Sequence, residues 1–463
     1  MGTTDLSNLD SEDNLGSETT QLIAAVTKIT ALLRKCWGVA GAGIISANLK
    51  RTLNGDPVGF NPTVAGKGVY ALFGFVGIND FSHILKSLDQ RVVMLINDVA
   101  KVVHNEIFRW GHRDHGQCNK NNGGTFLMVY RIGDFKTVKE NRKIAADLMF
   151  SSPVERGALG GNSIPRMRKN NALEEKMNSI KLITLPGITG FTDRALLGML
   201  KSFAGIRKEE SLKRWESSFE LGAGVGAYSV ELIFGLHAGW AVEGAVGSTY
   251  KVDATYLSPH VNMASRMMSA CKQYRVFVLL SQDFEELLSK EAKDSLRHID
   301  TVYVKGSSVK QRIYTYDVRH NGVDFFLLDR TEEGANKEAD QYCAEIWNRD
   351  LDLKAMRDHI TPEFTEAFRV GMQSYLDAEW ITAVAKLKEA NDVMIRNVVD
   401  DGNIVEVALY GSKILDKSNQ SENVCRLRHE IGDGPCQALI SYMEGYDCIA
   451  PDDWDGVRPL MNK

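Results

Sequence analysis

The stretch GLHAGWAVEGAVGSTYKVDATYLSPHVNMASR, residues 235–266, decides the fold. Its first part continues an apolar run that begins before it, a pattern typical of a buried strand. Glycines and polar residues divide the centre into two β-prone runs, which predict a hairpin over residues 243–257. A helix is predicted from about Pro259 to Gln273. A strand, a hairpin and a helix in this order form the middle of the expected domain.

Strands and helices alternate on both sides of this stretch. On the amino-terminal side, a strand-like run ends near Ile78, a long helix is expected over residues 82–110, and residues 125–132 form a second strand-like run. The intervening residues 111–124 are polar and are predicted to form a loop. On the carboxyl-terminal side, short strands and a short helix complete the unit near residue 319. This alternation predicts an α/β fold.

Composition and periodicity change along the chain, and these changes mark predicted boundaries. The first residues are polar and acidic, and a helical pattern with one apolar face follows them. The carboxyl-terminal part is helical and contains one unit of helical-hairpin type, which is too little for a solenoid. The predicted segments are a disordered acidic tail (1–18), an amino-terminal helical segment (19–65), the α/β domain (66–319) with a loop insertion (151–184), and a carboxyl-terminal helical appendage (335–463).

Composition limits the partners and the compartment. The net charge is −5, and no run of Lys and Arg is dense enough for a nucleic-acid groove, so no nucleic-acid partner is expected. No stretch of about eighteen apolar residues occurs, so no transmembrane segment is predicted. The acidic start argues against a secretory signal. Seven cysteines without a CxxC pair indicate reduced thiols and a cytoplasmic protein.

Three ordered motifs carry a resemblance to a known family. GLHAGWAVEGAVGS, VNMASR and VYVKGSS follow one another at family-like spacing. Residues 66–319 thereby resemble the class III nucleotidyl cyclase catalytic domain, above all that of protist and algal cyclase-homology proteins. The resemblance implies an α+β sandwich with a ferredoxin-like core, and a homo- or heterodimer whose sites lie at the interface. Relatives in protists make a ciliary or axonemal location a further hypothesis.

The chemistry of this family sets what a competent site must contain. A ribose 3′-hydroxyl attacks the α-phosphate of the nucleotide, and pyrophosphate leaves. Two divalent ions activate the hydroxyl and hold the polyphosphate, and such hard cations require carboxylates. Arg or Lys side chains stabilise the phosphate charge, and polar groups recognise the base.

The two metal positions of the family are predicted to be lost. The first carboxylate opens an Asp-Ile-x-x-Phe-Thr motif, which here reads GINDFS and begins with Gly77. The second carboxylate follows a Lys or Glu by four residues and precedes a strand. Gly124 meets both conditions with Lys120, whereas Asp134 has Tyr130 four residues before it and a polar segment after it. Both positions are therefore assigned to glycine, and no bound metal or other cofactor is expected.

The other half of the family's site is predicted to be present. The resemblance assigns Lys120 and Thr255 to base recognition, as in adenylyl-type members. Asn262 matches the ribose-orienting Asn, and Arg266, four residues later on the same helical face, matches the Arg that stabilises the transition state. Lys305 matches a lysine that contacts the triphosphate. The tripeptide SPH before VNMASR departs from the family's Gly-Asp-Thr.

Each of these residues also has a structural interpretation, which stays open at this point. Asn262 can brace its helix, and Arg266 can form a surface ion pair. Lys120 can be solvated in a polar loop, and Lys305 likewise. Thr255 is also a good strand former.

Other histidines are interpreted structurally. His237 in GLHAGW is expected to be a core or interface residue. His112 and His115 lie near Asp114 and Cys118, but their spacing fits no standard zinc pattern.

Three functions follow from these assignments. The first is a catalytically inactive cyclase homologue that acts as a structural or regulatory subunit of a larger assembly, with docking through its helical extensions. The second is the Lys/Thr/Asn/Arg half of a heterodimeric adenylyl cyclase forming cyclic AMP, with Mg²⁺ or Mn²⁺ held by a partner's carboxylates. The third is a module that binds ATP without turnover. The missing carboxylates favour the first, so no enzymatic activity is expected of the chain alone.

Overall fold

The computed structural model describes residues 19–29, 65–111, 116–150, 181–221, 229–248, 251–304, 309–319, 323, 325, 331–398 and 431–460. They divide into two compact units, which are described separately. The larger unit takes in Gly68–Ala241 and Ser258–Lys463, and the smaller takes in Met1–Lys67 and Val242–Leu257. The predicted acidic tail (1–18) lies outside the described residues, as do residues 151–180 of the predicted insertion.

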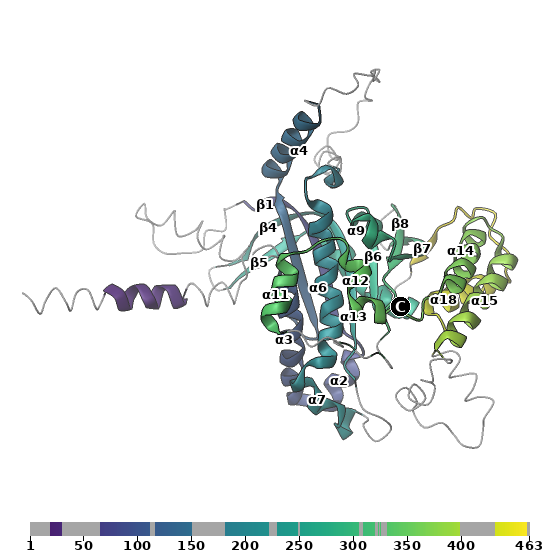
Figure 1. Cartoon of the computed structure of the whole chain (residues 1–463), viewed down its shortest axis with the longest axis horizontal. Coiled ribbons are helices and arrows are strands. Elements are labelled where there is room, and N and C mark those ends of the chain that lie inside the picture. Colours follow the sequence, from purple (N-terminus) through teal and green to yellow (C-terminus); the bar gives the residue numbers. More distant parts are fainter. Residues whose placement is uncertain are drawn as a thin grey trace, which may run out of the picture. The chain divides into compact units, whose positions relative to one another are not determined.

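A mixed β-sheet is the centre of the larger unit (Figure 1). Among the described residues its strand order is β2-β3-β1-β4-β6-β8-β7-β9. The pairs β1–β3, β2–β3, β6–β8 and β7–β8 are antiparallel, whereas β4–β6 and β7–β9 are parallel. The strands are β1 (Lys67–Ile78), β2 (Gly116–Asn122), β3 (Thr125–Asp134), β4 (Leu232–Gly247), β6 (Val278–Ser281), β7 (Arg297–Val304), β8 (Lys310–Thr315) and β9 (Arg458–Leu460).

Helices cover the sheet and connect its strands. Those that precede residue 300 are α2 (Phe81–Leu88), α3 (Val92–Trp110), α4 (Phe135–Phe150), α6 (Ile188–Lys208), α7 (Glu210–Glu216), α8 (Pro259–Tyr274), α9 (Gln282–Glu285) and α10 (Lys290–Lys293). Those that follow are α11 (Glu332–Asp340), α12 (Ile346–Arg349), α13 (Leu351–Ala355), α14 (Pro362–Leu376), α15 (Trp380–Val398) and α18 (Gly434–Glu444).

The first four strands follow the ferredoxin-like plan. The chain runs β1-α3-β2-β3-α6-β4 while the sheet order is β2-β3-β1-β4, which is the βαββαβ arrangement. β1 is buried along most of its length because apolar clusters cover both faces of the sheet. This explains its continuous apolar sequence. The predicted α/β class with helical extensions is confirmed.

Two hydrophobic cores lie on the two faces of this sheet. On one face, side chains of β1 and β3 pack with α3 and α6, as shown by Leu72, Phe126 and Leu196. On the other face, Ile233 and Leu279 belong to a cluster with α8 and the carboxyl-terminal helices α14, α15 and α18. The carboxyl-terminal helices therefore share a core with the sheet.

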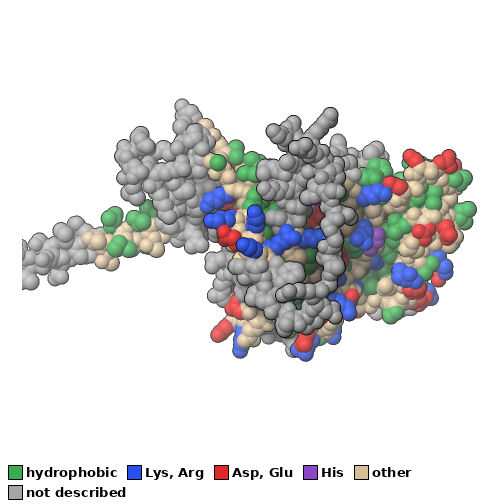
Figure 2. Space-filling model, turned by 90° about the horizontal axis from the view of Figure 1, so that it is seen from above, with side chains coloured by type: hydrophobic (Ala, Val, Ile, Leu, Met, Phe, Trp, Pro, Cys, Tyr) green, Lys and Arg blue, Asp and Glu red, His purple; other side chains and the backbone are tan. Residues whose placement is uncertain are grey.

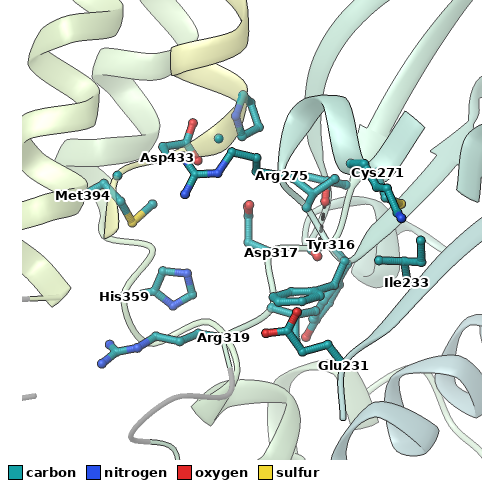
Figure 3. A pocket seen from close by; sticks show the side chains of 18 of the residues that line it. Glu231, Ile233, Cys271, Arg275, Tyr316, Asp317, Arg319, His359, Met394 and Asp433 are labelled. Atoms are coloured by element: carbon teal, nitrogen blue, oxygen red, sulfur yellow. Dashed lines mark hydrogen bonds between the residues drawn. The ribbon is translucent and has the colours of Figure 1, made fainter. Parts of the chain in front are cut away.

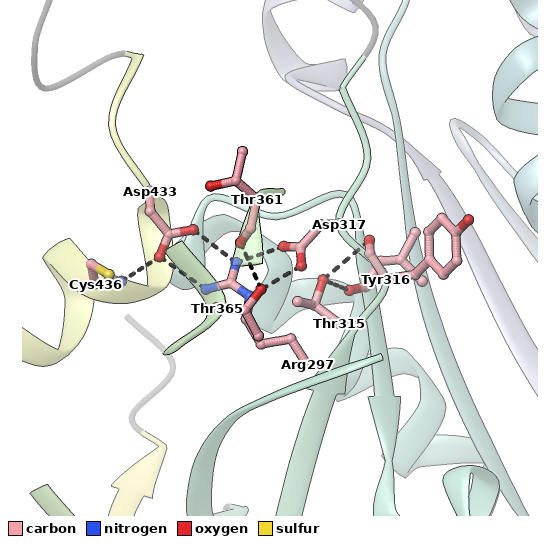
Figure 4. A network of polar contacts seen from close by, with 9 residues as sticks. Arg297, Thr315, Tyr316, Asp317, Thr361, Thr365, Asp433 and Cys436 are labelled. Atoms are coloured by element: carbon pink, nitrogen blue, oxygen red, sulfur yellow. Dashed lines mark hydrogen bonds and ion pairs between the residues drawn. The ribbon is translucent and has the colours of Figure 1, made fainter. Parts of the chain in front are cut away.

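A buried ionic network fastens the carboxyl-terminal part to the sheet (Figure 4). Arg297, at the start of β7, donates from Nη2 to Asp317 Oδ1 at 2.5 Å and to Asp433 Oδ1 at 2.7 Å. Its guanidinium carbon lies 4.4 Å from the centroid of the Phe368 ring on α14. Asp433 also caps α18 by accepting from the backbone nitrogen of Cys436 at 2.9 Å.

The pKa of Asp433 reflects this network. Burial raises it, but the charge and hydrogen bonds of Arg297 outweigh burial and lower it below its ordinary value. The carboxylate is therefore ionised beside its partner, and the network is an ion pair rather than a neutral contact.

Two strands differ from the sequence-based prediction. The polar residues 111–124, predicted as a loop, contain β2, which pairs among the described strands with β3 alone. An edge strand has few buried positions, so its sequence carries no apolar alternation. The end of the chain, predicted to be irregular, contains β9, where Arg458–Leu460 pair with Val302–Val304.

The smaller unit contains a hairpin and a helix. The hairpin joins the end of β4 to β5 (Val252–Leu257), with Gly244 opposite Thr255, and agrees with the prediction over residues 243–257. The helix covers residues 19–29, and its predicted apolar face is exposed to solvent. No helix in the described part of the chain is long and apolar enough to cross a membrane.

Candidate functional site

The two glycines assigned to the metal positions lie next to each other, Gly77 near the end of β1 and Gly124 in the turn between β2 and β3. Gly77 is opposite Thr125 in the β1–β3 ladder, and the backbone nitrogen of Ile78 donates to the carbonyl oxygen of Gly124 at 2.8 Å. Asp134 is opposite Val69, at the other end of the same ladder. Strand geometry puts that end roughly 25 Å from Gly77, at about 3.3 Å per residue. Gly124 is therefore the neighbour of Gly77, and Asp134 is remote from both.

Apolar side chains cover both glycines. A Cβ atom added at Gly77 would lie 2.8 Å from Sδ of Met268, which belongs to α8. A Cβ atom added at Gly124 would overlap the Phe81 ring. A divalent ion requires several oxygen ligands, and these positions present hydrogen, thioether and aromatic groups instead. The residues present do not fit a metal ion.

Asp80 is the carboxylate nearest in sequence to the first position, and the backbone turns it away from the strand. Its φ of 50° is left-handed, and it lies at the amino end of α2. Its carbonyl oxygen accepts from the backbone nitrogen of His83 at 3.0 Å. Its side chain is exposed and lines a cavity described below.

Helix α8 carries two predicted site residues on one face. Ser258 caps it by accepting from the backbone nitrogen of His260 at 2.9 Å. Asn262 is exposed, and Arg266, one turn later, is half-buried. Gly235 of β4 lets the helix approach the sheet closely, because an added Cβ would overlap the backbone nitrogen of Met268. The same helix thus presents Asn262 and Arg266 and places Met268 over Gly77.

A pair of histidines fixes the amino end of α8 to the sheet. Nε2 of His237, on β4, is 2.8 Å from Nδ1 of His260, and the two rings stack with centroids 5.0 Å apart. Nδ1 of His237 is 2.6 Å from Oγ of Ser281. Burial lowers the pKa of His260 to about 4 and lowers that of His237 well below 6.5. The pair is neutral near pH 7, in keeping with the predicted structural role of His237.

The other predicted site residues do not belong to α8. Lys120 is exposed in β2, opposite Leu127, on the hairpin whose turn contains Gly124. Thr255 is in β5 of the smaller unit. Lys305 lies outside the described residues, as do His112 and His115.

A cavity of about 650 Å³ lies at the end of β1 (Figure 3). Its size falls within the range of small-molecule pockets. Nδ1 of His359 is buried and has no hydrogen-bond partner in the described part of the chain. Sequence reasoning missed this cavity because its walls come from distant segments whose proximity only the fold creates. Among the lining residues are Asn79, Asp80, Arg275, Arg319, His359 and Asp433.

Comparison with family models relates part of this chain to known proteins. Residues 195–320 match the model "Adenylate and Guanylate cyclase catalytic domain". Residues 3–50 match the model "RasGEFs all helical domain". The cyclase match includes Thr255, Asn262 and Arg266, and it begins after both Gly77 and Gly124 in the sequence.

Two curated proteins are similar over about a quarter of this chain. An adenylate cyclase of Anabaena cylindrica is 33% identical over 127 residues, which cover 27% of this chain and 24% of that protein. A terminal-differentiation-specific adenylate cyclase of Dictyostelium discoideum is 34% identical over 139 residues, which cover 26% of this chain and 6% of that protein. Residues 195–320 of this chain are therefore similar to the adenylate and guanylate cyclase catalytic domain, and the matched regions span a quarter or less of the two curated relatives.

Solved structures of cyclases align with this chain at low sequence identity. A bacterial light-regulated adenylyl cyclase aligns with a TM-score of 0.39 and 16% identity, over 68% of this chain and 66% of that one. The adenylyl cyclase CyaB from P. aeruginosa aligns with a TM-score of 0.34 and 16% identity, over 54% of this chain and 95% of that one.

Proposed function

We propose that this chain is a catalytically inactive homologue of class III cyclases that acts as a structural or regulatory subunit of a larger assembly. The adjacent glycines at positions 77 and 124 carry this proposal. Both positions lack a carboxylate, and Met268 and Phe81 cover them with apolar atoms. Without carboxylates this site cannot hold the ions that the family's reaction uses.

A second function is supported by the exposure of the retained residues. Asn262 and Lys120 are exposed to solvent, so a partner subunit can reach them. With a partner that supplies both carboxylates and thereby binds Mg²⁺ or Mn²⁺, this chain would form half of an adenylyl cyclase. Recovery of a carboxylate-bearing cyclase homologue in equal amount with the natural protein would favour this function over the first.

Restoring the carboxylates tests the proposed loss of activity. Cyclic AMP formation from ATP is measured with Mg²⁺ and with Mn²⁺ for the wild type, for Gly77→Asp/Gly124→Asp, and for that double variant with Met268→Ala added. The wild type is expected to be inactive. The triple variant is expected to be more active than the double variant, because removing the Met268 thioether makes room for the new carboxylate at position 77, whereas the Phe81 ring has to move away from position 124 in both variants.

Two controls decide how the result is interpreted. Met268→Ala alone must stay inactive, and Asn262→Ala in the triple variant must abolish any restored activity. Activity of the unmodified chain would contradict the proposed function. Nucleotide binding is tested separately, by adding ATP to the wild type with a bound fluorescent nucleotide and no metal. Displacement of the fluorescent nucleotide by ATP would support a third function as a non-hydrolysing nucleotide module.

A further inference from the structure

The carboxyl-terminal helices carry a group of exposed apolar side chains at one end. Ile381 is 76% exposed, Ile449 is 70% exposed and Tyr446 is 48% exposed. The turn after α18 has left-handed backbone at Asp447 and Cys448, with φ of 54° and 58°, and this turn presents Tyr446 and Ile449 to solvent.

Side-chain contacts show that these residues lie at the same end of the helix pair. Gln437 of α18 donates to Asn391 of α15 at 3.4 Å, and Lys388 donates to Glu444 at 2.8 Å. Residue numbers rise along α18 as they fall along α15, so the two helices are antiparallel. The residues that follow Glu444 therefore meet the amino end of α15, where Ile381 is located.

A cluster of packed aromatic rings supports this end. The ring of Trp380 lies 5.0 Å from that of Trp454, 5.7 Å from that of Tyr442 and 5.8 Å from that of Tyr446, measured between centroids. Trp380 is almost completely buried. Large interlocked rings resist displacement, so the exposed apolar side chains stand on a rigid base.

Seven exposed carboxylates belong to the same chain segments as the apolar side chains. Hydrophobic, acidic and basic side chains are interspersed over the carboxyl-terminal helices (Figure 2). Within the described residues, Glu444 pairs with Lys388 and Asp455 pairs with Lys310, whereas the other five carboxylates form no ion pair. The seven exposed residues are Asp377, Glu379, Glu444, Asp447, Asp452, Asp453 and Asp455.

We propose that this surface, termed the acidic-rimmed patch (Ile381, Tyr446, Ile449 and the seven carboxylates), docks a protein segment with aliphatic side chains flanked by Lys and Arg. The apolar centre would bury the aliphatic side chains, and the rim would pair with the basic ones. The rim repels phosphate groups, so nucleic acid and anionic membranes do not fit. The proposal does not rest on the cyclase homology, because the patch lies outside the residues that match the cyclase model.

Binding of a model peptide to the full chain tests this docking surface. The probe is a fluorescein-labelled amphipathic peptide with leucines at i, i+3, i+4 and i+7 spacing and lysines elsewhere, followed by anisotropy. Ile381→Ser/Ile449→Ser should weaken its Kd about tenfold or more, because the variant removes two aliphatic contacts. Asp447→Asn/Asp452→Asn/Asp453→Asn should weaken the Kd and reduce its dependence on salt.

Matched controls separate docking from general attraction. Val93→Ser changes a 57% exposed apolar side chain on α3 and should leave the Kd unchanged. A peptide with glutamate in place of lysine should not bind. Equal binding by the wild type and the Ile381→Ser/Ile449→Ser variant, with unchanged circular dichroism, would overturn the proposal. Binding of the wild type to phosphatidylserine vesicles in preference to the peptide would overturn it as well.

Discussion

Gly235 of β4 lies against the backbone of α8. An added Cβ would overlap backbone atoms of Met268 and Ala264, and backbone cannot rotate away as a side chain can. Gly235→Ala should therefore lower the free energy of unfolding by about 1–3 kcal/mol, as overpacking does. Urea unfolding measures this effect. Gly334→Ala on α11, where the nearest atom is Thr331 Oγ1 at 3.3 Å, should change stability by less than half as much.

His260 gives a prediction for pH. Its folded-state pKa is about 4 because of burial, below its ordinary 6.5. Between these values the unfolded chain binds a proton that the folded chain does not, so stability falls as pH falls from 6.5 towards 4. One such histidine contributes a slope of about 1.4 kcal/mol per pH unit. The neighbouring His237 adds to this slope, since burial lowers its pKa too.

Urea unfolding across this range measures the slope. His260→Gln should give a flatter dependence than the wild type, by about 1 kcal/mol per pH unit. The matched control is His83→Gln, which changes an exposed imidazole on α2 and should leave the slope as it is. A slope unchanged by His260→Gln would mean that His260 takes up its proton over the same pH range in the folded chain as in the unfolded chain, which would contradict the prediction.

At the scale of elements, the helix α18 depends on one carboxylate. Asp433 caps α18 and pairs with Arg297, so Asp433→Ala would leave a buried guanidinium with Asp317 alone. Breaking a buried pair costs about 3–5 kcal/mol. The variant should lose stability by this amount, and the amides of α18 should exchange hydrogen faster than those of α3. Asp392→Asn, at an exposed position of α15, should leave both measurements unchanged.

Elements with strong burial could be predicted from the sequence, and edge elements could not. β1 and α8 follow from apolar patterning, because β1 is buried within the sheet and α8 packs on it. β2 is polar because it is an edge strand, and three-residue β9 is too short to show a pattern. Prediction from local sequence depends on hydrophobic periodicity, whereas β2 and β9 form because of the strands that lie beside them in the fold.

For the candidate site, the assignment of Gly77 and Gly124 to one site could be inferred from motif spacing, and the structure places them next to each other. That the side chains of Met268 and Phe81 cover these glycines could not be inferred from the sequence. Met268 lies 191 residues after Gly77 in sequence, and only the packing of α8 on β4 brings its thioether there. The assignment of both glycines to metal positions stays a prediction, which the restoration assay tests.

At the scale of the whole molecule, the parallel pairing of β9 with β7 has a consequence for biosynthesis. Val302 and its partner Arg458 are 156 residues apart. A ribosome adding roughly 5–20 residues per second needs about 8–30 s to pass from one to the other. Throughout that interval the nascent chain displays an open strand edge, which is a template for unwanted pairing with other nascent chains. During this part of translation, chaperones and neighbouring nascent chains can therefore influence whether the chain folds or aggregates.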